Sequence, residues 1–214
     1  MNLIGEKFVQ QYLRVINPII GWFVKINIHP NTVTWAGLVL TFVAANFYRI
    51  GSFVLGGIFL VLAGTCDVLD GQIARRTDRK NKFGAFFDST VDRYSDIIIF
   101  LGLAIYFDKL YIYVLVILAI SGSLLTSYAR ARAGALGVDC KVGLMQRPER
   151  ITYVAGATIF DGIVGWFFEL LFGVEHLLVI AVLWFVAVIS NVTVLQRVVY
   201  VKRQLESLNN RTQA

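Results

Sequence analysis

Six long apolar stretches dominate the chain and limit what it can fold into. They run over residues 32–50, 52–76, 84–107, 111–129, 151–172 and 176–200, each close to the ~20 residues that a helix needs to cross a bilayer. A membrane barrel would instead show strands of about 10 residues with alternating character. With 57% hydrophobic residues, 16% charged residues and a mean hydropathy of +0.67, the 214 residues predict an all-α integral membrane protein with six transmembrane helices.

One more helix is expected ahead of the first span, over residues 1–28. Apolar residues recur there at helical spacing with polar residues between them, which is typical of an amphipathic helix lying in the membrane interface. The stretch lacks the features of a cleaved signal peptide, so we expect it to stay on the mature protein. No internal repeat or linker is visible, and residues 1–214 are expected to form one membrane domain with a six-helix core over 30–204.

Basic residues are concentrated in alternate connections. The N-terminal segment, the second-to-third loop, the fourth-to-fifth loop and the tail are basic, whereas the opposite connections hold only Arg49 and Lys109. Because basic loops stay in the cytoplasm, we expect both termini on the cytoplasmic side of the inner membrane. The net charge of +6 then favours anionic lipid headgroups, and no nucleic-acid partner is expected. Cys66 and Cys140 fit neither a ligand pair nor a disulfide framework.

Acidic residues stand on small-residue stripes of the second and third apolar stretches. These stripes comprise Asp67, Asp70, Gly71 and Ala74 in the second stretch and Gly84, Asp88 and Asp92 in the third. The spacings of three and four residues place each set on one helix face. Because small residues let membrane helices approach closely, we expect the two faces to meet and to bring four carboxylates to one depth near the cytoplasmic end.

Four carboxylates inside a membrane require compensation, because each costs a few kcal/mol and they repel one another. Arg75 neutralises one at most, so two hard divalent cations are expected. Two alternatives remain: a structural cluster paired with nearby basic residues, and an ion-coupled transporter, whose sites tend to lie near the bilayer midplane. Asp96, one turn further on, also fits a polar filler, and Asp78 fits a surface charge. The basic residues near the acids are Arg75, Arg76, Lys82 and Arg93.

The stretch resembles the D-x-x-D-G-x-x-A-R…G-x-x-x-D-x-x-x-D signature of the CDP-alcohol phosphatidyltransferases. The matching residues are Asp67, Asp70, Gly71, Ala74, Arg75, Gly84, Asp88 and Asp92. The resemblance implies an enzyme of six spanning helices that works as a homodimer and moves a phosphatidyl group from CDP-diacylglycerol to an alcohol, releasing CMP. A prenyltransferase with Asp-rich motifs also binds Mg-diphosphate, but its pattern lacks the Gly-x-x-Ala-Arg run.

The same resemblance implies roles for individual residues. Asp67, Asp70, Asp88 and Asp92 would bind two ions of Mg²⁺ or Mn²⁺, and Asp92 would also be the general base for the incoming hydroxyl. The residues implied for the nucleotide and CDP-lipid are Asn31, Thr32, Val33, Thr34, Gly71, Ala74, Arg75, Asn81 and Gly84. Asn31 or Thr32 fits a plain helix N-cap equally well.

A second set of residues bears on the acceptor. These residues are Tyr128, Arg130, Arg132, Arg147, Arg150 and Arg197, all at expected cytoplasmic helix ends. Guanidinium groups converging on one pocket suit an acceptor with its own phosphate, whereas a free polyol needs fewer cations. The segments are similar to those of family members that use inositol 3-phosphate, with Arg130 in place of a lysine and Gly134 in place of a glutamate. Inositol 3-phosphate is therefore the favoured acceptor, and glycerol 3-phosphate is the alternative.

Overall fold

The computed structural model describes residues 6–212, and its regular structure within that range is entirely helical. The helices are α1 (Glu6–Lys25), α2 (Pro30–Arg49), α3 (Phe53–Arg76), α4 (Lys82–Phe107), α5 (Leu110–Ala135), α6 (Arg147–Phe172) and α7 (Leu177–Thr212). The all-α prediction is confirmed. Residues 1–5 of the predicted N-terminal helix lie outside the described residues, and side chains are described over residues 10–207.

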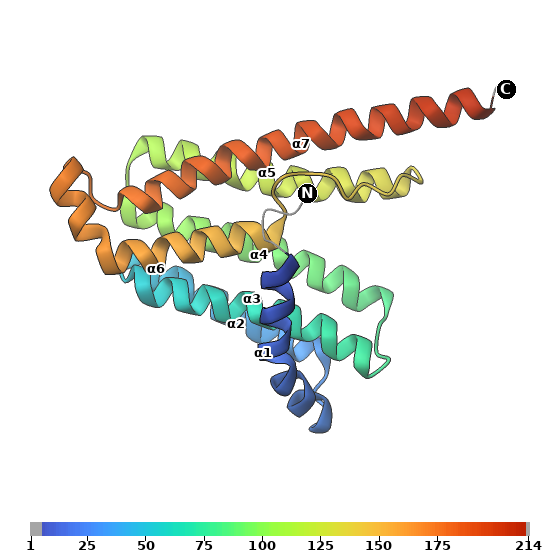
Figure 1. Cartoon of the computed structure of the whole chain (residues 1–214), viewed down its shortest axis with the longest axis horizontal. Coiled ribbons are helices and arrows are strands. Elements are labelled where there is room, and N and C mark those ends of the chain that lie inside the picture. The colour runs from blue at the N-terminus through green and yellow to red at the C-terminus, as the bar shows by residue number, and fades with distance from the viewer. Residues whose placement is uncertain (1–5, 213–214) are drawn as a thin grey trace.

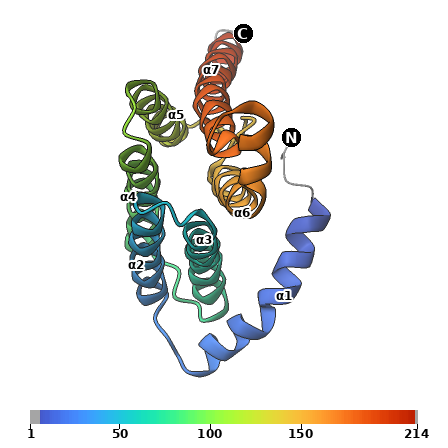
Figure 2. The same ribbon diagram turned by 90° about the vertical axis from the view of Figure 1, so that its left-hand side faces the viewer.

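Helices α2 to α7 form two rows that run along the long axis of the molecule (Figure 1). Viewed end-on, α2, α4 and α5 make one row, and α3, α6 and α7 make the other (Figure 2). Within the rows α2 packs on α4 and α3 packs on α6, and the rows join where α2 meets α3 and α5 meets α7. The loops at 77–81 and 136–146 and the C-terminal part of α7 lie at the same end of the bundle (Figure 1).

Within residues 6–212, four helices are long and apolar enough to cross a membrane. They are α3, α5, α6 and the Leu177–Ser207 part of α7, with mean hydropathies of 1.8, 2.0, 1.5 and 2.6. A multi-pass membrane protein follows from their length and composition. Helix α4 is not among them, because its 26 residues carry acidic and basic side chains as far along as Asp96.

Glycines allow neighbouring helices within each row to touch along their backbones. A Cβ atom at Gly102 of α4 would lie 2.5 Å from the carbonyl oxygen of Ala45 on α2, and one at Gly57 of α3 would lie 3.0 Å from the carbonyl oxygen of Ala155 on α6. At 2.5 Å, a Cβ at residue 102 would clash with the Ala45 carbonyl oxygen. The absence of side chains at these crossings therefore determines how closely the helices pack around the site.

Helix α1 runs obliquely beside the two rows and packs against α3 on one face (Figure 2). Ile16 and Ile20 are buried in a cluster with Ile73, and the Tyr12 hydroxyl donates a hydrogen bond of 2.7 Å to Thr65. The opposite face is exposed, with Trp22 as an example. This one-sided burial is the packing expected of an amphipathic helix.

The charged ends of three helices extend further than the hydropathy pattern indicated. Helix α5 continues to Ala135 rather than 129, α6 begins at Arg147 rather than 151, and α7 continues to Thr212 rather than 200. Basic residues are good helix formers, so loss of hydropathy does not end a helix. The start of α6 is set by a reciprocal capping box between Gln146 and Glu149.

A polar cluster ties helices together at the far end of the bundle from the α6 N-terminus. His176, in the α6–α7 connection, has Nδ1 2.7 Å from Asp161 Oδ2 and Nε2 2.9 Å from the Tyr106 hydroxyl, and the Leu178 backbone N–H donates to Asp161 Oδ1 at 3.2 Å. The imidazole ring lies 4.4 Å from the Phe53 ring. The cluster joins α3, α4, α6 and α7, and we call Tyr106, Asp161 and His176 the far-end cluster.

Candidate active site

Three carboxylates from two helices meet near the end of the bundle that carries the loop at 77–81. One oxygen each of Asp67 and Asp70 on α3 and Asp88 on α4 lie within 4.8 Å of one another. Thr34 of α2 donates a hydrogen bond of 2.6 Å to Asp70 Oδ2. The two acidic stripes therefore face each other, as the small residues beside them predict.

Asp92 joins this group through Arg147, the first residue of α6. The Arg147 Nη1 atom lies 2.8 Å from Asp67 Oδ2 and 2.8 Å from Asp92 Oδ1. Arg93 also approaches Asp92, at 3.8 Å. We refer to Asp67, Asp70, Asp88 and Asp92 as the acid cluster; together with Thr34 and Arg147, these residues line one small cavity.

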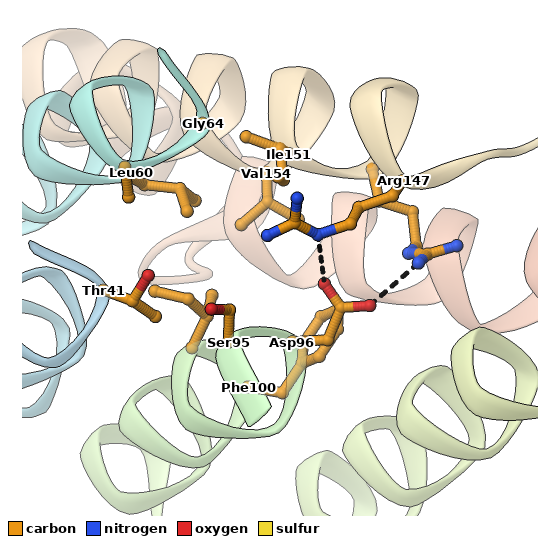
Figure 3. A pocket seen from close by; sticks show the side chains of 12 residues that line it. Thr41, Leu60, Gly64, Ser95, Asp96, Phe100, Arg147, Ile151 and Val154 are labelled. Carbon is orange, nitrogen blue, oxygen red and sulfur yellow. Dashed lines mark hydrogen bonds and ion pairs between the residues drawn. The ribbon is translucent and has the colours of Figure 1, made fainter. Parts of the chain in front are cut away.

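Asp96 lies one helical turn beyond Asp92 and anchors two arginines. Its Oδ2 atom accepts hydrogen bonds from Ser123 on α5 and, at 2.8 Å, from Arg150 on α6, while its Oδ1 atom lies 3.9 Å from Arg147 Nε. Figure 3 shows the Arg147 guanidinium group turned towards this carboxylate. Asp96 is thus an ion-pair partner of α6 rather than the polar filler that was the alternative.

A cavity of about 20 Å³ lies behind the acid cluster, and Figure 3 shows its lining. Thr41, Ser95, Asp96, Arg147 and Arg150 form its polar side, and its other walls are mainly apolar. Nε and Nη1 of both arginines are buried and have no hydrogen-bond partner among the described residues.

The acid cluster fits a hard divalent cation. Its donors are carboxylate oxygens from two facing helices, and Asp88 Oδ1 is buried without a hydrogen-bond partner among the described residues. Such an oxygen is costly to bury unless a cation or a donor reaches it. Mg²⁺ and Mn²⁺ prefer oxygen ligands of this kind, so these residues suit the predicted metal site.

The residues predicted to contact the nucleotide have diverse surroundings. Asn81 caps α4 by accepting a hydrogen bond of 2.6 Å from the Gly84 backbone N–H, and a Cβ at Gly84 would lie 3.6 Å from Asn31 Oδ1. These three residues are therefore neighbours. The Thr34 hydroxyl donates its hydrogen bond to Asp70, and the Val33 side chain is buried beneath α1.

The remaining predicted nucleotide residues include one correction. Arg75 is exposed beside Gly71, where an added Cβ would lie 3.7 Å from Arg75 Nη2. Ala74 lies on the same helix, α3, and Thr32 lies on α2. The alternative interpretation of Asn31 or Thr32 as the N-cap of α2 is wrong. His29 is the cap: its Nδ1 accepts from the Asn31 backbone N–H at 3.2 Å, and Pro30 occupies the first helical position, where a missing N–H costs nothing.

The six predicted acceptor residues divide into two groups by position: four lie on α5 and α7, and two lie at the start of α6. Tyr128, Arg130 and Arg132 are exposed near the end of α5. Arg197 is buried and donates to the carbonyl oxygens of Val142 and Thr126 at 2.9 and 2.5 Å.

In the second group, Arg147 and Arg150 contact carboxylates of α3 and α4. The predicted partners of those carboxylates, Arg75, Arg76 and Lys82, are not among their ion pairs in the described part of the chain, although Arg93 is. The sequence carried a signal for Asp96, which continues the four-residue spacing of Asp88 and Asp92, but none for Ser123.

Comparisons with known proteins agree with this geometry. Residues 27–189 match the model of the CDP-alcohol phosphatidyltransferase family. The archaetidylinositol phosphate synthase of Methanothermobacter thermautotrophicus is 34% identical over 206 residues, covering 95% of this chain and 98% of the relative. The phosphatidylinositol phosphate synthase of Streptomyces avermitilis is 34% identical over 212 residues, covering 94% of this chain and 85% of the relative.

A solved structure is similar over most of the chain. It is the phosphatidylinositol phosphate synthase of Mycobacterium tuberculosis with CDP-DAG bound, with a TM-score of 0.74 and 27% identity, covering 88% of this chain and 94% of that one. The same enzyme has been solved in complex with manganese and citrate, with a TM-score of 0.74 and 26% identity over 86% of this chain and 87% of that one. The family resemblance inferred from the signature is therefore confirmed.

Proposed function

Because the chain belongs to the CDP-alcohol phosphatidyltransferase family, we propose that it transfers the phosphatidyl group of CDP-diacylglycerol to inositol 3-phosphate in phospholipid biosynthesis. The acid cluster carries this proposal, since it places carboxylates from two helices around one point. The names of two relatives that cover most of the chain support inositol phosphate as the acceptor. Glycerol 3-phosphate remains the alternative acceptor.

In this proposal the acid cluster holds two divalent ions, Mg²⁺ or Mn²⁺. When bound, such ions neutralise the diphosphate of the donor and stabilise CMP as a leaving group. A divalent metal is supported by the donor set of the cluster and by the manganese complex of the mycobacterial relative. The diphosphate would meet these ions beside Thr34 and Arg147, which line the same small cavity as the acid cluster.

The reaction is a substitution at the phosphorus that carries the diacylglycerol. The hydroxyl oxygen of the acceptor forms a bond to this phosphorus, the bond to the CMP oxygen breaks, and CMP leaves with the electron pair. Asp92 takes the hydroxyl proton as general base. Its place at the edge of the acid cluster, one helical turn beyond Asp88 on α4, supports this assignment.

The donor and acceptor would occupy different sides of the acid cluster. Asn31, Asn81 and Gly84 lie together beside it, which supports a nucleotide site over this part of α2 and α4. Thr32, Val33, Thr34, Gly71, Ala74 and Arg75 complete the proposed donor site. The residues proposed for the acceptor phosphate are Tyr128, Arg130, Arg132, Arg147, Arg150 and Arg197, and of these Arg147 also contacts Asp67 and Asp92 of the cluster.

In the membrane, we propose that α2 to α7 all span and that α1 lies in the interface. Both termini and the acid cluster would then face the cytoplasm from the inner membrane. The gathering of the basic loops and the C-terminal part of α7 at one end of the bundle supports this orientation (Figure 1). By analogy with the family, two copies would form a homodimer.

The test is CMP release by the purified protein with CDP-diacylglycerol and Mg²⁺. The acceptors compared are inositol 3-phosphate, glycerol 3-phosphate, free inositol and serine, with EDTA added in a parallel series. We expect metal-dependent release that requires inositol 3-phosphate. Asp67→Asn should abolish it, while Asp139→Asn, a matched change in an exposed ion pair with Lys141, should not.

Each other result would change a specific part of the proposal. Faster release with glycerol 3-phosphate would replace the acceptor and keep the reaction. Full activity in EDTA would contradict the proposal that the acid cluster binds divalent ions needed for the reaction. No release with any acceptor would contradict the transfer reaction itself.

A further inference from the structure

We propose that Arg147 is a built-in counter-cation of the acid cluster that a divalent metal must displace, so that this one side chain sets the metal affinity of the site. The inference rests on the proposed function, because it requires the acid cluster to bind metal. It concerns a different property, however: the strength of binding rather than its existence.

The geometry places Arg147 in competition for metal ligands. One nitrogen, Nη1, lies 2.8 Å from both Asp67 Oδ2 and Asp92 Oδ1. Asp67 is also one of the three acids whose oxygens lie within 4.8 Å of one another. A carboxylate oxygen held by a guanidinium group is less available to a metal ion, and the positive charge also repels a cation placed beside it.

The base of the Arg147 side chain is fixed. The capping box of Gln146 and Glu149 holds the start of α6. The loop before it is tied to α7, because the Met145 backbone N–H donates to Thr193 Oγ1 and the Leu144 backbone N–H donates to the Gln196 side chain, both at 3.1 Å. The backbone of Arg147 thus stays beside the cluster when its guanidinium group moves.

The guanidinium group itself is held by charge more than by hydrogen bonds. Nε and Nη1 of Arg147 are buried and lack a hydrogen-bond partner among the described residues, although Nη1 is close to two carboxylates. Arg150 differs, because its Nη2 donates a 2.8 Å hydrogen bond to Asp96. Of these two neighbouring arginines, Arg147 is therefore the one that an entering metal ion would displace.

The direct test is a titration of the purified, full-length protein with Mn²⁺, following free Mn²⁺ by electron paramagnetic resonance. We expect Arg147→Gln to lower the Mn²⁺ Kd by about tenfold, equivalent to 1.4 kcal/mol, because the competing charge is gone. Arg147→Lys keeps the charge and should stay nearer to the wild type. Arg203→Gln, the same charge change at an exposed position of α7, should leave the Kd unchanged.

A second measurement uses only the wild-type chain and so does not depend on how the variants fold. Phenylglyoxal labelling of arginine, read by mass spectrometry, should increase at Arg147 when Mn²⁺ is added, because the side chain leaves the carboxylates. Arg150, which is 4% exposed and paired with Asp96, is the internal reference and should stay unlabelled.

The outcomes separate this inference from the proposed function. An unchanged or weaker Mn²⁺ affinity in folded Arg147→Gln, or unchanged labelling of Arg147 with Mn²⁺, would overturn the counter-cation role while leaving the metal site intact. Mn²⁺ binding that is absent from the wild type, or that survives unchanged in Asp67→Asn, would overturn the metal site and the inference with it.

Discussion

Asp96 illustrates how a single charged residue is accommodated inside this bundle. Its carboxylate is buried and receives donors from α5 and α6, and neither donor is a neighbour in the sequence. Burying such a group is favourable only when its partners are in place, and removing one partner of a buried pair leaves an uncompensated charge. Asp96 therefore contributes to stability, whereas Asp92, one turn away, is proposed to act in the reaction.

The stability role of Asp96 is testable by Asp96→Asn. We expect a loss of about 3 kcal/mol in the free energy of unfolding, because Arg150 keeps its charge without a carboxylate. The measurement is urea or SDS unfolding in detergent, followed by circular dichroism. Asp139→Asn, in a pair whose side chains are about 70% exposed, is the control and should unfold like the wild type. A wild-type midpoint for Asp96→Asn would refute the anchoring role.

The proposed role of Asp92 predicts a different pattern for Asp92→Asn. Removing a general base should lower turnover by about 10²- to 10⁴-fold, while the binding of CDP-diacylglycerol remains. CMP release measures the first quantity, and displacement of a labelled CDP-lipid measures the second. Turnover close to that of the wild type would exclude Asp92 as the base.

At the scale of helices, close backbone contacts position the site. Gly102 brings α4 against Ala45 of α2, and Gly57 brings α3 against α6. Because the acid cluster is divided between α3 and α4, and Arg147 comes from α6, these crossings fix the distances between the charged groups. A methyl group at a crossing would therefore separate helices that carry opposite parts of the site.

Gly102→Ala tests this arrangement. The new Cβ would lie 2.5 Å from the Ala45 carbonyl oxygen, so α2 and α4 must separate, and overpacking of this kind costs about 1–3 kcal/mol. The control is Gly156→Ala on α6, where a Cβ meets nothing within 4 Å. Thermal unfolding should show a lower midpoint for the first variant only. Equal midpoints for the two variants would contradict a tight α2–α4 crossing.

The sequence predicted those parts of the charged site that depend on residue spacing within one helix, and it did not predict pairings between residues far apart in the chain. The meeting of Asp67, Asp70 and Asp88 followed from spacings within two helices. The pairing of Arg150 with Asp96 did not, because 54 residues separate them and the rule for basic loops explains an arginine at any cytoplasmic helix end. For the same reason Arg147 was assigned to the acceptor alone, although it also contacts Asp67 and Asp92.

The whole molecule has polar groups at both ends and apolar packing between them. The acid cluster and its arginines lie at the end where α6 begins, and the far-end cluster joins α3, α4, α6 and α7 at the other. Asp161 lies 14 residues after Arg147 along α6, which is roughly 21 Å at the rise of a helix. The two clusters are thus too far apart to share ligands.

This separation predicts that the far-end cluster can be weakened without harming the metal site. His176→Ala removes the partner of both Asp161 and Tyr106, and we expect a loss of about 1–3 kcal/mol in stability because Asp161 is left buried. The Mn²⁺ Kd and the KM for each substrate should stay within twofold of the wild type. A large change in the Mn²⁺ Kd would show that the two ends are coupled.

The pairing of Asp96 with Arg150 also has a consequence for how the protein is made. Asp96 leaves the ribosome 54 residues before Arg150, which is roughly 3–10 s at ordinary rates of synthesis. During that interval α4 carries its acids without the arginines of α6, and a helix with unpaired charges enters lipid poorly. Under the proposed topology, in which α4 spans the membrane, we therefore expect α4 to wait beside the translocation channel until α6 arrives, so that the order of membrane insertion differs from the order of synthesis.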